Sequence, residues 1–117
     1  MKEQILIFGL GHIGGSIAKS LCKQGISVYA EDLSKKTIRY AIKNKIIKGT
    51  LSDLDLSKPY SIIFSTPPIV TNELINENKD LIKNAVLFTE TSSSKNKIKK
   101  NAFINKIENA ILSHPIA

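Results

Sequence analysis

The fold is decided by the stretch Ile5-Leu6-Ile7-Phe8-Gly9-Leu10-Gly11-His12-Ile13-Gly14-Gly15-Ser16. A short apolar run is followed here by glycines with the spacing G-x-G-x-x-G. The apolar run predicts a buried β-strand, and apolar residues at helical spacing after the glycines predict a helix that ends at Gly25. A glycine-rich turn that joins a strand to a helix is typical of sheets that bind the phosphates of dinucleotides.

Each glycine of this motif has a physical task in that interpretation. Gly9 permits the tight turn, Gly11 lets a pyrophosphate approach the backbone, and Gly14 lets the helix pack closely on the strand. The amides of His12 and Ile13 then face the phosphates, where the helix dipole favours negative charge. A glycine-rich turn that binds no ligand is the alternative interpretation.

The rest of the chain alternates short apolar runs with amphipathic stretches. Strands are expected at residues 5–8, 27–31, 48–51, 61–65, 85–88 and 110–112, and helices follow at 34–45, 69–83 and 94–106. Most of these strands are apolar on both faces, which favours a parallel sheet with helices on both sides. We therefore expect residues 1–117 to form one domain, a doubly wound α/β (Rossmann) sheet of about six strands in the order 3-2-1-4-5-6.

Ligands of such sheets bind beyond the carboxyl ends of the strands, so the residues that follow each strand are candidates for a site. Asp32 follows the second strand, where an acid accepts hydrogen bonds from the adenosine ribose. A carboxylate there repels a 2′-phosphate and favours NAD over NADP, although Lys35 and Lys36 could tolerate that phosphate. Glu31 is the neighbouring candidate, and a role of Asp32 in starting the next helix is the alternative.

The composition is that of an ordinary globular protein and excludes several other classes. The 117 residues are 42% hydrophobic and 23% charged, which allows one domain with its own core. The single cysteine excludes an internal disulfide and a zinc site built from cysteines, and we expect no metal site. No apolar run reaches the roughly 20 residues of a membrane span, and the first run is too short for a signal peptide. We expect a cytoplasmic protein that binds no membrane.

The net charge of +7 raises the question of an acidic partner. Arg39 is the only arginine, aromatic residues make up 6%, and tryptophan is absent. Proteins that bind nucleic acids rely on arginine and on aromatic side chains that stack on bases. The lysines are spread over expected helices and loops, so we interpret them as solvated surface, with attraction of an anionic small molecule as the weaker interpretation. We expect no nucleic-acid partner.

Four segments that follow expected strands share a pattern with one enzyme family. They are the glycine loop at 9–16, Ser65-Thr66-Pro67-Pro68, Thr89-Glu90-Thr91-Ser92-Ser93-Ser94-Lys95 and Ser113-His114-Pro115-Ile116-Ala117. In this order and spacing they resemble prephenate dehydrogenases and the related arogenate dehydrogenases, over nearly the whole chain. The chain departs from the family where Ser92 and Ser113 stand at positions that are usually glycine.

The resemblance implies an NAD-dependent oxidative decarboxylation of prephenate or arogenate in tyrosine biosynthesis. His114 would be the catalytic base that takes the proton of the substrate's ring hydroxyl, and Ser93 would hydrogen-bond that hydroxyl and the histidine. Without the resemblance, His114 would be interpreted as a surface residue and Ser93 as part of a helix cap. The cofactor-binding residues would be Gly9, Gly11, His12, Ile13, Gly14, Asp32, Ser65, Thr66 and Pro67.

The family also has a helical second domain, which would follow Ala117, form the homodimer and close the site. We expect residues 1–117 alone to bind NAD and to turn over little or no substrate. Two other functions stay open. The chain could belong to another dehydrogenase with the same glycine loop, such as a β-hydroxyacid dehydrogenase or an imine reductase. It could also be a stand-alone module that binds NAD(H) and pairs with a separate helical partner.

Overall fold

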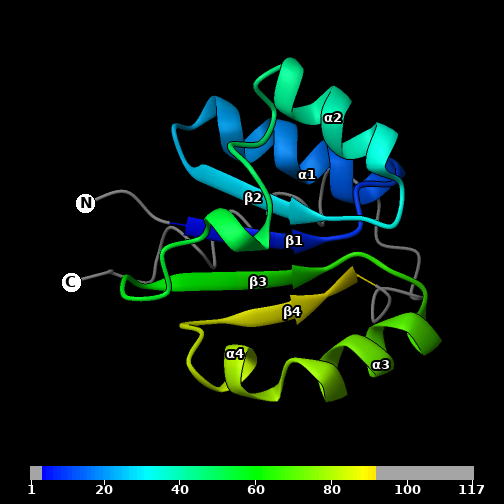
Figure 1. Cartoon of the computed structure of the whole chain (residues 1–117), viewed down its shortest axis with the longest axis vertical. Coiled ribbons are helices and arrows are strands. Elements are labelled where there is room, and N and C mark those ends of the chain that lie inside the picture. Colours follow the sequence, from blue (N-terminus) through cyan, green and yellow to red (C-terminus); the bar gives the residue numbers. More distant parts are fainter. Residues whose placement is uncertain (1–3, 92–117) are drawn as a thin grey trace.

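The computed structural model describes residues 4–91, which form a parallel sheet with helices on both faces (Figure 1). The described strands pair in the order β2-β1-β3-β4, all of them parallel. They are β1 (Gln4–Phe8), β2 (Ser27–Glu31), β3 (Tyr60–Phe64) and β4 (Phe88–Glu90). The helices are α1 (His12–Lys23), α2 (Lys35–Lys43), α3 (Pro68–Glu77) and α4 (Lys79–Lys83), with a short 3-10 helix η1 (Leu51–Asp53). The expected doubly wound α/β class is confirmed.

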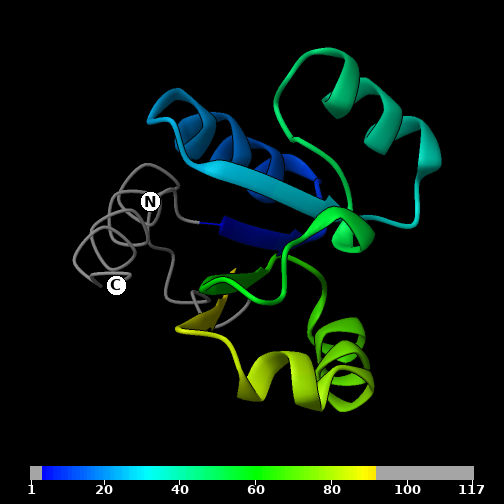
Figure 2. The same ribbon diagram turned by 60° about the vertical axis from the view of Figure 1, so that its left-hand side comes forward.

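The alternation of side chains along β1 divides the core into two layers. Ile5 and Ile7 pack in one cluster with buried residues of α1, β2 and α2. Leu6 and Phe8 pack in the other, against which apolar side chains of α3 and α4 also lie. Figure 2 shows α1 and α2 on one side of the sheet and α3 and α4 on the other. β1 and β3 are buried along their whole length. For this reason, polar and apolar residues do not have to alternate along them.

The prediction of a strand at 48–51 is wrong. Gly49 makes a single parallel bridge to Tyr29 of β2, and the chain then turns into η1. The physical reason is a capping box, in which the Thr50 amide donates to the Asp53 carboxylate at 3.0 Å and the Thr50 side chain caps the amide of Asp53. This local closure ends the pairing with β2 after one residue. The strand order therefore differs in detail from the expected one, because a bridge stands where the third strand was expected.

Other expected elements also have different bounds in the structure, and two of them show the physical reason. β4 spans Phe88–Glu90 rather than 85–88, because the preceding residues contact β3 without forming a regular ladder, as in the bond from Val86 N–H to the Tyr60 carbonyl (2.8 Å). The helix expected at 69–83 is divided at Asn78, whose side-chain amide donates to the Leu74 carbonyl at 2.8 Å and competes with the helical pattern. The helix expected at 94–106 and the strand expected at 110–112 lie outside the described residues.

Candidate functional site

The carboxyl ends of β1, β2 and β3 meet at one edge of the sheet, and a pocket of about 560 Å³ opens there. Its wall combines two acids with apolar side chains from three loops and from α3. The residues that line it are Phe8, Gly9, Glu31, Asp32, Leu33, Leu51, Thr66, Pro67, Val70 and Leu74. We call it the edge pocket. Four of the residues expected to bind a cofactor, Gly9, Asp32, Thr66 and Pro67, are thus brought together.

Gly9 and Gly14 are held where no side chain fits. Gly9 has a φ of +96°, and a Cβ there would lie 2.4 Å from the carbonyl oxygen of Ser65. A Cβ on Gly14 would lie 2.0 Å from the carbonyl oxygen of Gly9. The turn after β1 therefore packs directly on the loop after β3 and on the first turn of α1, as the tight-turn interpretation requires.

Gly11 is different, because its missing side chain leaves open space. It is exposed, and a Cβ there would meet no atom of the protein within 4 Å. Gly11 is the N-cap of α1, no described side chain caps this helix end, and the first turn carries no acidic residue. The first amides of a helix have no partner within the helix. The turn therefore offers backbone donors, a favourable dipole and room for an anionic group such as a pyrophosphate.

Asp32 joins two loops through its carboxylate. One oxygen accepts a hydrogen bond from Leu10 N–H at 2.7 Å, and the other accepts one from Ser34 N–H at 2.8 Å. Ser34 is the N-cap of α2 and accepts from Thr37 N–H, so Asp32 does support the start of that helix. Each carboxylate oxygen has a further acceptor site, and Asp32 lines the edge pocket. The two interpretations of Asp32 are therefore compatible.

Glu31 has a separate structural task. Its carboxylate accepts a hydrogen bond from Leu51 N–H at 2.9 Å and so holds η1 beside β2. Its own carbonyl accepts from Gly9 N–H at 2.8 Å. Glu31 lies in the wall of the edge pocket next to Asp32, but Asp32 is the acid that is bonded to the glycine turn.

The loop after β3 is held by a set of hydroxyl groups. Ser65 continues the pairing of β3 with β1 by donating its N–H to the Phe8 carbonyl at 2.7 Å, and its Oγ lies 3.4 Å from the Thr91 hydroxyl. Thr66 shares a 2.6 Å hydrogen bond with Thr71 of α3. Sequence reasoning missed Thr71, although a threonine in the first turn of a helix that begins beside a candidate loop is a usable signal.

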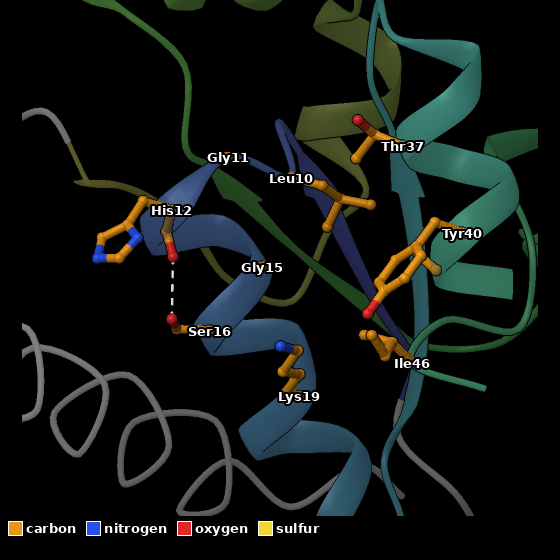
Figure 3. A pocket seen from close by; sticks show the side chains of 10 residues that line it. Leu10, Gly11, His12, Gly15, Ser16, Lys19, Thr37, Tyr40 and Ile46 are labelled. Atoms are coloured by element: carbon orange, nitrogen blue, oxygen red, sulfur yellow. Dashed lines mark hydrogen bonds between the residues drawn. The ribbon is translucent and has the colours of Figure 1, made fainter. Parts of the chain in front are cut away.

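His12 places its backbone, rather than its ring, at the glycine turn. Figure 3 shows the imidazole pointing away from a second pocket, of about 410 Å³, that lies between α1 and α2. The His12 carbonyl accepts a hydrogen bond from the Ser16 hydroxyl at 2.9 Å, drawn as a dashed line in Figure 3. Lys19 of α1 and Tyr40 of α2 line this second pocket, and no sequence motif had singled them out.

Three remaining predictions concern the catalytic pair, a metal site and membrane spans. Ser93 and His114, the expected catalytic pair, lie outside the described residues. Within residues 4–91, no group of three histidine, cysteine, aspartate or glutamate side chains is placed to hold a metal ion. In the same part of the chain, every helix is too short or too polar to cross a membrane.

Comparisons with known proteins place this geometry in context. Comparison with protein-family models found no match, and comparison with curated proteins found none. Among solved structures, a prephenate dehydrogenase from A. aeolicus, in complex with hydroxyphenyl propionate and NAD+, is 25% identical with a TM-score of 0.61. The match covers 78% of this chain and 34% of that one. A second structure of prephenate dehydrogenase from Aquifex aeolicus is 26% identical with a TM-score of 0.59, over 74% of this chain and 34% of that one.

A third similar structure, Synechocystis arogenate dehydrogenase, supports the fold alone. It is 19% identical with a TM-score of 0.63, over 86% of this chain and 37% of its own. The chain thus spans about a third of the length of these structures. Over that length, the fold of this chain is similar to that of prephenate and arogenate dehydrogenases.

Proposed function

We propose that the chain is the NAD-binding part of a dehydrogenase that acts on prephenate or arogenate. The observation that carries the proposal is the glycine turn, open at Gly11 and bonded through Leu10 N–H to Asp32 at the rim of the edge pocket. The likeness to a prephenate dehydrogenase whose structure contains NAD+ supports it.

The edge pocket and the start of α1 beside it fit the parts of a dinucleotide. The backbone at Gly11 and the start of α1 would bind the pyrophosphate, because they offer donors in open space. Asp32 would accept hydrogen bonds from the adenosine ribose with the acceptor sites left on its oxygens. Leu51 and Pro67 supply apolar surface for the adenine ring.

The same acid sets the expected preference between NAD and NADP. A 2′-phosphate placed at the ribose would stand beside the Asp32 carboxylate, and like charges at that distance repel. Lys35 and Lys36 are exposed at the start of α2 and reduce this repulsion without removing it. We expect tighter binding of NAD than of NADP.

In the proposed reaction, bound NAD supplies the hydride acceptor, and the protein supplies position and a base. By the family resemblance, His114 takes the proton of the ring hydroxyl and Ser93 orients that hydroxyl. The loss of CO2 yields an aromatic ring, so the reaction is favourable once the reactants are aligned. The contribution of the protein is therefore mainly the alignment of substrate and cofactor.

The sharpest test of cofactor binding is Gly11→Ala, because the structure separates its effect on binding from its effect on folding. The added methyl group meets no protein atom within 4 Å, so the stability should stay close to that of the parent. The same methyl group would stand where the pyrophosphate approaches, and we expect NAD affinity to fall by at least about tenfold. Isothermal calorimetry gives the affinity, and urea denaturation gives the stability.

Gly15→Ala is the matched control. Its Cβ would meet only the Leu10 carbonyl, at 3.4 Å, and Gly15 is the fourth residue of α1, beyond the helix start that would bind the pyrophosphate. This variant should bind NAD like the parent. No NAD binding by the parent, or equal binding by Gly11→Ala, would contradict the proposed function. In a protein that also carries the helical second domain, formation of NADH with prephenate or with arogenate, and its loss in His114→Asn, would then identify the substrate and test the base.

A further inference from the structure

A buried hydroxyl beside the edge pocket has no place in the function as proposed so far. Thr71 lies in the first turn of α3 and is 1% exposed. Its Oγ1 is 3.0 Å from the Thr66 carbonyl oxygen and 2.6 Å from the Thr66 hydroxyl. A buried hydroxyl with two partners in one residue fixes the conformation of that residue, because leaving either group unpaired would be costly.

The protons of this pair can be assigned from the chemistry of the groups. A carbonyl oxygen can only accept, so the single proton of Thr71 goes to the Thr66 carbonyl. Thr71 must then accept from the Thr66 hydroxyl in the shorter bond. The hydroxyl proton of Thr66 is therefore directed toward α3, and Thr66 has no donor left for a ligand.

The same bonds decide which part of Thr66 meets the glycine turn. The methyl carbon of Thr66 lies 2.9 Å from the position that a Cβ of Gly9 would take. Thr66 and Gly9 are neighbours in the wall of the edge pocket. If the side chain of Thr66 rotated, its hydroxyl would turn toward this wall and the fit against Gly9 would change.

We infer that Thr71 is a positioning residue for dinucleotide binding, which acts by locking Thr66 against Gly9 at the edge pocket. The inference rests on the proposed function, because it concerns the same pocket. Thr71 does not line that pocket and acts through Thr66 alone.

The test compares Thr71→Val with Thr71→Ser. Valine has nearly the same shape but removes both hydrogen bonds, and we expect NAD binding to weaken by about tenfold. Serine keeps the hydroxyl, and its NAD affinity should stay within about twofold of the parent's. Affinities are measured by calorimetry at a temperature at which circular dichroism shows each variant to be folded.

Tyr60→Phe is the control for a purely structural effect. It also removes a buried hydroxyl bond, from Tyr60 to the Leu81 carbonyl, but at the opposite end of β3. This variant should lose stability and keep the NAD affinity of the parent. If Thr71→Val binds as tightly as the parent, or if Thr71→Ser binds as weakly as Thr71→Val, the inference is wrong while the proposed function stands. A parent chain that does not bind NAD overturns both.

A second variant keeps the inference testable if Thr71→Val does not fold. Thr66→Val changes a partly exposed side chain. It removes the hydroxyl that donates a hydrogen bond to Thr71. We expect about threefold weaker NAD binding from the loss of this one bond. Unchanged affinity in Thr66→Val would overturn the inference.

Discussion

Replacing Asp32 by alanine should damage both the fold and the site, and the structure gives the size of the first effect. The change removes two charge-assisted hydrogen bonds, of 2.7 Å from Leu10 N–H and 2.8 Å from Ser34 N–H. Such bonds contribute about 1.5–3 kcal/mol each. The Ser34 amide is exposed and regains water, whereas Leu10 is only 8% exposed and its amide stays poorly hydrated.

The expected loss is therefore dominated by the Leu10 amide. We expect Asp32→Ala to lower the free energy of unfolding by about 2–4 kcal/mol, measured by urea denaturation followed by circular dichroism. For a domain of this size the melting temperature should fall by about 10 °C. NAD affinity, measured where the variant is folded, should fall as well, because the ribose acceptor is lost.

Glu31→Ala is the matched comparison, since it removes an acid of the same charge from the position directly before Asp32. Glu31 accepts one hydrogen bond through its carboxylate, from Leu51 N–H, so the expected loss of stability is smaller, about 1.5 kcal/mol. NAD affinity should change less than in Asp32→Ala. A loss below about 0.5 kcal/mol in Asp32→Ala, or a larger effect of Glu31→Ala on NAD affinity, would refute the reasoning on Asp32.

Two further predictions concern stability away from the site. Lys45 has a φ of +58° after the end of α2, so Lys45→Gly should raise the free energy of unfolding by about 0.5–1 kcal/mol, and an unchanged urea midpoint would contradict this. Burial raises the pKa of Tyr60 above its ordinary value of 10.0, so its neutral form is favoured in the folded state. The contribution of Tyr60 to the free energy of unfolding is then fully present below about pH 10. It is lost as the pH rises through the raised pKa. The parent should therefore be more stable than Tyr60→Phe at neutral pH and lose that advantage above pH 10, and an advantage that persists in alkaline urea titrations would exclude this account.

Local patterns in the sequence predicted the parts of the fold that depend on local forces. The run 5–8 and the glycines after it predicted β1 and the turn into α1, because burial on both faces and a positive φ each restrict the residue type. The helix expected at 34–45 begins at Lys35, because the Ser34 side chain accepts a hydrogen bond from Thr37 N–H and caps the helix. The alternation of strands and helices then left few topologies.

What the sequence did not predict depends on contacts between distant segments. The strand expected at 48–51 was wrong because the capping box of Thr50 and Asp53 competes with pairing to β2. The second role of Asp32 requires the Leu10 amide to arrive from another loop. Thr71 was missed because the value of its hydroxyl lies in the position of Thr66, which only the packing of α3 reveals.

The single bridge between Tyr29 and Gly49 has a consequence for aggregation. β2 is the outermost described strand on its side of the sheet, and an open outer strand can recruit the strand of another molecule. Here Lys48 N–H donates to the Val28 carbonyl at 2.7 Å, and Ala30 N–H donates to the Gly49 carbonyl at 3.1 Å. The crossing segment thus uses two of the backbone groups that a foreign strand would need and then turns away into η1. The bridge therefore leaves fewer backbone groups at this edge for pairing with another molecule.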